Sequence, residues 1–303
     1  MRSVSLIVLA MVCTAWVWGQ SGSQASMQQA IERAISLGKA GQIDLGLAQL
    51  EPYLDRPTAR TAKACYVAGF LFKERYKTHS LDPAAPADRE AAVRWLGTAL
   101  ELQAQGPTTA PWTTSARQAM NYLGGTLFDD AVKAVRTFEP GQEADVFALL
   151  DDHVEVARAL DPTVDATAER TEFHKNLARA YREWFEATEE EAHFEGIVAQ
   201  YQAALALSPG DITATYNLAV NIYNRGVAQI NAMDENTSLA EIFLIQDAST
   251  ALFQRALPWF EKADALQPNR PETLRGLMIV HHALFHAAEE EAYRVQLEEA
   301  LKR

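Results

Sequence analysis

The chain has 303 residues, of which 48% are hydrophobic and 22% are charged. This composition supplies a sizeable buried core and excludes a wholly disordered chain. The net charge of −13 argues against a nucleic-acid partner, because phosphate contacts need clustered Lys and Arg. It also argues against electrostatic attachment to anionic lipid.

The first residues predict a signal peptide. Arg2 precedes the short apolar run SLIVLAMVCTAWVW, and Gly19 and a polar stretch follow it. Signal peptides typically have a basic residue, then an apolar run too short to span a bilayer comfortably, and then small residues at the cleavage site. We expect a signal peptide over 1–19 and a flexible mature N-terminus over 20–26. An uncleaved membrane anchor is the alternative.

The mature chain is expected to be exported, to the periplasm or outside the cell. The simple signal peptide and the Ala-rich composition indicate a bacterial protein. Cleavage leaves Cys65 as the one cysteine, so no intramolecular disulfide is possible and the fold depends on packing. The apolar neighbours of Cys65 indicate a buried, inert thiol. No later segment is long and apolar enough to insert in a membrane.

The rest of the chain is expected to be all-α. Ala, Leu, Glu and Gln dominate, and strand-type alternation is scarce. In EFHKNLARAYREWFEA, apolar residues recur at four, four and three positions, which is the spacing of one helix face. Short polar, Pro or Gly stretches divide the chain into six helix pairs. These begin near Met27, Thr58, Trp112, Ala166, Ile212 and Pro271.

Three segments are similar to one another when they are aligned on their last proline. They are HVEVARALDP, AQYQAALALSP and PWFEKADALQP, and they end at Pro162, Pro209 and Pro268. In each, a bulky residue precedes a small one by three positions, and the proline follows five later. Small residues allow two helices to approach closely, and proline ends the second helix of a pair.

These residues resemble the tetratricopeptide repeat family. Second-helix positions match at Ala256, Phe260, Ala263 and Pro268, and first-helix positions match at Leu177, Ala178, Tyr181, Leu218, Ala219 and Gly226. The resemblance implies a right-handed superhelical solenoid of about six antiparallel helix pairs. It is specific over about residues 166–270 and degenerate elsewhere, so we expect degenerate helix pairs over 27–165 and a repeat region at 166–303.

One pair departs from the repeat length. Pro209 and Pro268 are 59 residues apart, where one repeat has about 34. We therefore expect an insert over about 227–255 that lengthens both helices of that pair, with Asn236 or Thr237 capping the second helix. Pro258 is expected to bend that helix where the insert joins the repeat.

Catalytic and metal-binding motifs are weak. The chain contains no Walker-type loop, GxGxxG, GxSxG, CxxC or HExxH. His282 and His286 are expected one turn apart on a helix and could share a metal with Glu289 or Glu290, but a solvated or inter-repeat face is the favoured interpretation. Glu190 and His193 have the spacing of di-metal carboxylate bundles, without the second copy that such sites need. We expect no cofactor, no metal and no enzymatic activity.

The function favoured by the resemblance is a protein–protein interaction scaffold, which would bind a peptide or protein partner in its concave groove in the cell envelope. A small-ligand-binding helical protein is the alternative, and a metal-dependent enzyme using His282 and His286 is a less favoured one. First helices line the concave side of such solenoids. The candidate contacts are therefore Lys175, Asn176, Arg179, Arg182, Asn217, Asn221, Asn224 and Arg275.

Overall fold

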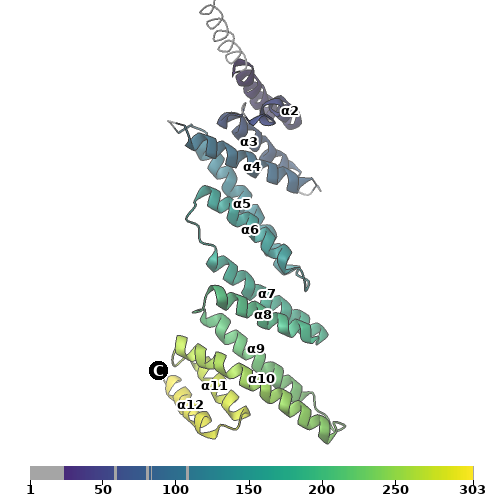
Figure 1. Ribbon diagram of the computed structural model, residues 1–303, viewed down its shortest axis with the longest axis vertical. Helices are drawn as coiled ribbons and strands as arrows, with labels where there is room; N and C mark the ends of the chain where they lie inside the picture. Colours follow the sequence, from purple (N-terminus) through teal and green to yellow (C-terminus); the bar gives the residue numbers. More distant parts are fainter. Residues whose placement is uncertain (1–23, 58–59, 80–81, 83, 107–108, 303) are drawn as a thin grey trace, which may run out of the picture. The chain divides into compact units, whose positions relative to one another are not determined.

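The computed structural model describes residues 24–57, 60–79, 82, 84–106 and 109–302, and within these ranges it is helical without a strand (Figure 1). The expected signal peptide at 1–19 lies outside the described residues. A helix spans residues 24–39, so residues 24–26, expected to be flexible, are helical. No helix in the described ranges combines the length and apolar character that a membrane crossing needs.

The helices follow one another as six consecutive pairs, as the apolar periodicity and the prolines predict. Residues 24–39 form the first helix, and the proline breaks at 162, 209 and 268 all fall between helices. The remaining helices are α2 (Ile43–Leu54), α3 (Ala62–Thr78), α4 (Ala85–Ala104), α5 (Thr113–Arg136), α6 (Glu143–Leu160), α7 (Thr167–Thr188), α8 (Glu191–Leu207), α9 (Ile212–Asn231), α10 (Leu239–Leu266), α11 (Pro271–Ala283) and α12 (Ala287–Ala300).

The chain forms two compact units. The first contains the chain up to Asp129 together with Asp151–Val164, and the second contains Asp130–Leu150 and Asp165–Arg303. The division therefore does not fall at residue 166 alone, because the end of α5 and the start of α6 group with the later repeats. These residues turn out to form one wall of the candidate site.

The first unit contains two apolar clusters, one centred on α3 and the other on α4 and α5. Cys65 is fully buried in the first cluster, and its burial raises the pKa of the thiol. Gly69 on α3 packs against the backbone of α4: a Cβ added there would lie 2.8 Å from the amide nitrogen of Leu96 and 3.1 Å from the carbonyl oxygen of Ala92. This close approach requires glycine.

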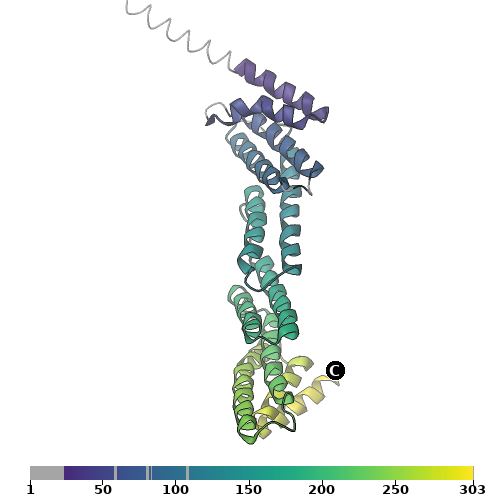
Figure 2. The same cartoon turned by 90° about the vertical axis from the view of Figure 1, so that its right-hand side faces the viewer.

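In the second unit, small residues face large rings. A Cβ on Gly196 would lie 2.5 Å from the ring of Tyr181, and one on Gly226 would lie 2.7 Å from the ring of Phe253. The ring of Phe260 covers Gly276 in the same way. Figure 2 shows the yellow end of the chain beside the green α9 and α10, where the Gly226 and Gly276 contacts are made.

The long pair differs in detail from the expectation. A turn at DENTS separates its helices, as expected, but only α10 is longer than its neighbours: it has 28 residues, whereas α9 has 20 and α7 has 22. The N-cap of α10 is Ser238 rather than Asn236 or Thr237, and its hydroxyl and the Glu241 carboxylate form a capping box.

The helix α10 is not divided at Pro258. It runs without interruption from Leu239 to Leu266, so the insert and the second helix of the repeat form one element. A proline removes one amide donor, but tertiary packing of the flanking turns can maintain the helix across it. Phe253, Ala256 and Phe260 are all buried around Pro258 and supply that packing.

The close approach at Gly69 gives the first prediction. Replacing Gly69 with Ala should lower the free energy of unfolding by about 1–3 kcal/mol, because backbone rather than a flexible side chain must move. Chemical denaturation followed by far-ultraviolet circular dichroism measures the change.

Gly97 on α4 provides the matched control, since an added Cβ there meets nothing within 4 Å. Gly97→Ala should stabilise the protein by about 1 kcal/mol through helix propensity alone. Equal effects of the two substitutions would show that α3 and α4 are not in the close contact described.

Candidate functional site

The helix α7 presents two faces of different chemistry. Phe173, Leu177 and Tyr181 are buried and pack into the second unit, as their spacing predicts. Trp184 lies partly buried at the edge of this face, and its indole Nε1 donates to the carbonyl oxygen of Phe138 at 2.9 Å. The neighbouring face carries the polar residues that the sequence nominates as contacts.

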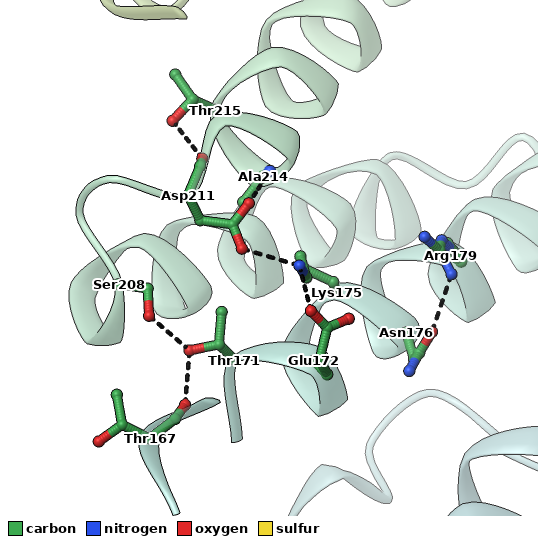
Figure 3. A network of polar contacts seen from close by, with 10 residues as sticks. All are labelled: Thr167, Thr171, Glu172, Lys175, Asn176, Arg179, Ser208, Asp211, Ala214 and Thr215. Carbon is green, nitrogen blue, oxygen red and sulfur yellow. Dashed lines mark hydrogen bonds and ion pairs between the residues drawn. The ribbon is translucent and has the colours of Figure 1, made fainter. Parts of the chain in front are cut away.

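Lys175 is not available to a partner. Only 7% of the residue is exposed, and its Nζ lies 2.8 Å from Asp211 Oδ2 and 2.5 Å from Glu172 Oε1 (Figure 3). Asp211 also caps α9, because its Oδ1 accepts from the amide of Ala214 at 2.8 Å. The expectation that Lys175 lines the binding face is therefore wrong: its ammonium group joins α7 to the start of α9.

The two charges hold each other ionised. Burial alone would raise the pKa of Asp211, but hydrogen bonds from Lys175 and from the Ala214 amide outweigh it and lower that pKa. Burial likewise opposes the charge of Lys175, yet the bonds to Asp211 and Glu172 raise its pKa. A buried ion pair of this kind is costly to break, because the remaining charge loses its partner.

A groove of about 470 Å³ lies between the end of α5 and α7 within the second unit. We call it the α5–α7 groove. Its lining is apolar and polar in similar measure, and its polar side chains are two arginines, one asparagine and one glutamate. The lining residues are Val132, Val135, Arg136, Phe138, Phe173, Asn176, Arg179, Ala180, Glu183 and Trp184.

Two of the nominated residues meet in this groove. The guanidinium Nη1 of Arg179 donates to Asn176 Oδ1 at 3.0 Å, which fixes the orientation of the carboxamide. In Figure 3 the amide nitrogen of Asn176 points away from Arg179. Arg179 is exposed, so its other donors can reach a ligand.

Tyr201 on α8 is influenced by three of the nominated residues. Burial raises the pKa of the Tyr201 hydroxyl, whereas the charges of Arg179 and Arg182 and a hydrogen bond with Asn217 act in the opposite direction. Arg182 is about half exposed, with Glu186 at 3.5 Å.

The other nominated residues lie elsewhere. Asn221 donates through Nδ2 to the carbonyl oxygen of Asn217 at 2.7 Å, so its amide is bonded to its own helix. Asn224 is exposed farther along α9. Arg275 is exposed on α11, where its charge acts on Tyr216 rather than on the groove.

Sequence reasoning missed the wall that α5 provides. Val132, Val135, Arg136 and Phe138 come from the preceding helix pair, and no motif in that segment marks them as site residues. Trp184 carried a usable signal, because a large amphipathic ring at the edge of an apolar stripe, next to Glu183, indicates a partly open position.

The histidine cluster has a different geometry from the one expected. His282 is in α11 and His286 is the N-cap of α12, so they do not share a helix. His286 Nδ1 lies 3.2 Å from Nδ1 of the buried His281, and His282 Nδ1 lies 3.1 Å from Glu290. In the ranges described, no three His, Cys, Asp or Glu side chains are grouped as metal ligands.

Glu190 and His193 also have structural surroundings. Glu190 is the N-cap residue of α8, and His193 is buried beneath it. The ring Nδ1 of His193 is 2.8 Å from the Thr188 hydroxyl, and its Nε2 is 3.8 Å from Glu190. These contacts connect the end of α7 to the start of α8.

No protein-family model and no curated protein matches the sequence. Among solved structures, the nuclear import adaptor Nro1 of S. pombe is 12% identical, with a TM-score of 0.34 over 92% of this chain and 93% of Nro1. Human IFIT1, in a dimer with m7Gppp-AAAA, is also 12% identical, with a TM-score of 0.34. That match covers 88% of this chain but 58% of IFIT1. Both are helical-repeat proteins, and matches at these TM-scores carry no argument about a partner.

The Lys175–Asp211 pair gives the second prediction. Asp211→Ala removes both the partner of Lys175 and the cap of α9, so the free energy of unfolding should fall by about 2 kcal/mol. Asp211→Asn keeps a capping side chain and should cost less. Chemical denaturation of both variants beside the wild type measures the two contributions.

The pH dependence of stability tests the contribution of the Lys175–Asp211 ion pair. The pKa of Asp211 is lower in the folded protein than its value of about 3.9 in unfolded chains. Its contribution is therefore fully present above that value and is lost as the pH falls through the folded pKa. The stability difference between wild type and Asp211→Asn should shrink below about pH 4, and a constant difference would contradict a charged pair.

Proposed function

We propose that this chain is a non-enzymatic scaffold that holds an extended peptide segment of a protein partner in the α5–α7 groove. The observation that carries the proposal is the combination of partly exposed apolar side chains with oriented hydrogen-bond donors in one groove. Val132, Val135 and Trp184 are partly buried and offer surface for a peptide side chain. Asn176 and Arg179 lie on the same side of the groove, with one bonded to the other.

Peptide recognition uses these groups directly. A carboxamide donates and accepts, so it can bind the backbone of an extended peptide, which offers both partners in each residue. An arginine binds a carboxylate with charge-assisted bonds, often two in parallel. The groove therefore suits a peptide with an apolar side chain and a nearby carboxylate, either an acidic side chain or a C-terminus.

Electrostatics support the carboxylate. The chain carries a net charge of −13, so most of its surface disfavours an anionic peptide. Arg136 and Arg179 line the groove, where Glu183 is the one acidic lining residue, and Arg182 is exposed on the same helix as Arg179. A local excess of positive charge on an acidic protein gives selectivity as well as affinity.

The composition of the groove supports binding rather than catalysis. None of its lining residues is a Ser, Cys, His or Lys that could act as a nucleophile beside a base. Apart from the carboxylate of Glu183, its polar lining groups are guanidinium and carboxamide side chains. Such groups orient a ligand without transferring protons to it.

The third prediction tests the groove. Arg179→Gln combined with Asn176→Ala should weaken binding of a fluorescein-labelled pool of short extended peptides containing Leu and Glu by about tenfold or more, because a charge-assisted bond is lost. The loss should be larger at low salt. Fluorescence anisotropy measures it, and the same pool with Gln in place of Glu should bind less tightly to the wild type.

A variant with the same chemical changes outside the groove is the control. Arg33→Gln with Asn224→Ala removes one arginine and one asparagine from exposed positions on residues 24–39 and on α9. It should bind the pool as the wild type does. Equal weakening by both variants would place the binding site outside the groove.

We also propose that the scaffold is exported to the bacterial periplasm or beyond. The support is the basic residue, the short apolar run and the small-residue exit within residues 1–19. In an oxidising compartment a buried, unpaired Cys65 is stable, because its raised pKa keeps the thiol protonated.

The fourth prediction tests this location. The mature protein recovered from a periplasmic extract should begin near Gln20. N-terminal sequencing or intact mass determines this directly. A mature chain that retains residues 4–17 would show that the proposed signal-peptide cleavage does not occur. That result would not affect the proposal of binding in the α5–α7 groove.

A further inference from the structure

The first two turns of α10 present an apolar face to solvent. Leu239 is 67% exposed, Phe243 57% and Leu244 69%. Leu239 and Phe243 are four positions apart, so they lie one above the other on the helix, with Leu244 beside them. We call these three residues the tip surface, because they adjoin the α9–α10 turn, which lies away from α11 and α12 in Figure 1.

This face is not part of the core of the second unit. The buried residues of α10 begin at Ser249 and continue through Phe253, Ala256, Phe260 and Ala263. They lie on the side of the helix opposite to Phe243 and Leu244. The tip surface is therefore additional to the residues that hold α10 against α9.

The helix is nevertheless firmly initiated at this end. The Ser238 amide donates to Glu241 Oε2 at 2.8 Å, and the Glu241 amide donates to the Ser238 hydroxyl at 3.3 Å. In the adjoining turn, Asp234 accepts from the amide of Asn236 at 2.9 Å. A capping box and a bonded turn present the apolar face in a fixed conformation.

The surroundings of the tip surface are acidic. From Gly226 to Gln254 the sequence contains Asp234, Glu235, Glu241 and Asp247, and it contains no Lys or Arg. A shallow groove of about 480 Å³ lies beside Leu244 and is lined in part by Asp234 and Glu241. Exposed apolar side chains with carboxylates beside them and no cation in the same segment match a ligand that is apolar on one face and basic around it.

We propose that the tip surface docks a basic amphipathic helix of another protein. The apolar face of such a helix would cover Leu239, Phe243 and Leu244, and its flanking Lys or Arg would face Glu235 and Asp247. Recognition of an amphipathic helix by an apolar surface is a recurrent mode of binding. An anionic membrane or a second copy of the tip would instead bring like charges together.

The test uses a synthetic amphipathic helical peptide of Leu and Lys, with a counterpart in which Glu replaces Lys. The wild-type protein should bind the Lys peptide and not the Glu peptide. Phe243→Gln with Leu244→Gln should weaken binding of the Lys peptide at least about tenfold, because two buried side chains are lost from the interface. Isothermal titration calorimetry measures both affinities.

Each substitution has a matched control. Leu45→Gln with Leu301→Gln changes two apolar side chains of similar exposure, 57% and 61%, and should leave binding unchanged. Glu235→Lys with Asp247→Lys should abolish binding, whereas Glu101→Lys with Glu155→Lys changes the net charge equally at exposed sites elsewhere and should reduce it far less.

Three results would overturn the proposal. These are equal affinity for the Lys and Glu peptides, equal losses in the tip variants and their controls, and binding of the tip to vesicles or to a second copy in place of the peptide. Vesicle sedimentation and light scattering detect the last. Arg179→Gln should leave the Lys peptide bound as in the wild type, so failure here is separate from failure of the α5–α7 groove.

Discussion

The contact between a small residue on one helix and a large side chain on its neighbour determines how closely the helices of this protein approach. Gly69 faces Leu96, Gly196 faces Tyr181, Gly226 faces Phe253 and Gly276 faces Phe260. A ring or branched chain fills the space that the missing side chain leaves, so the interior has neither a void nor a clash. Because α7 is held against α8 and α9 against α10 in this way, the polar residues that flank their packing stripes occupy defined positions.

The Lys175–Asp211 ion pair adds direction to this packing. Apolar contacts alone allow small shifts of one helix along another, whereas the Lys175 ammonium, at 2.8 Å from Asp211, ties α7 to the start of α9 at one position. Asn176 follows Lys175 in the chain, and Arg179 lies one turn beyond. The buried pair therefore positions the polar edge of the α5–α7 groove although it contacts no ligand. A charge on a helix exterior would have no such consequence.

The helix pairs could be predicted from the sequence because they depend on local signals, namely apolar period, prolines and small residues. The burial and pairing of Lys175 could not be predicted from the sequence, because its partner Asp211 is 36 residues away and the pairing depends on the fold. In a helical-wheel projection Lys175 lies on the same face as Arg179 and Arg182. It differs from them because Asp211, at the start of α9, pairs with its ammonium group. The α5 wall of the groove was missed for the same reason, since it comes from another repeat. The N-cap Ser238 could have been predicted, because Glu241 follows it by three residues as in a capping box. Asn236 and Thr237 were preferred because they are also good capping residues.

The two surfaces of the second unit differ in charge for a physical reason. In the α5–α7 groove, Arg136 and Arg179 share the lining with apolar and aromatic side chains, and the weakly hydrated guanidinium group tolerates such surroundings. At the tip surface, the acids Glu235 and Asp247 flank side chains that the fold does not need, since α10 is already anchored from Ser249 onward. An apolar residue that adds nothing to the core is exposed only at a cost in solubility, and the neighbouring carboxylates offset that cost. The same carboxylates exclude acidic segments of the kind that the groove accepts. On the two proposals, one unit would hold two partner segments of opposite charge without competition between them.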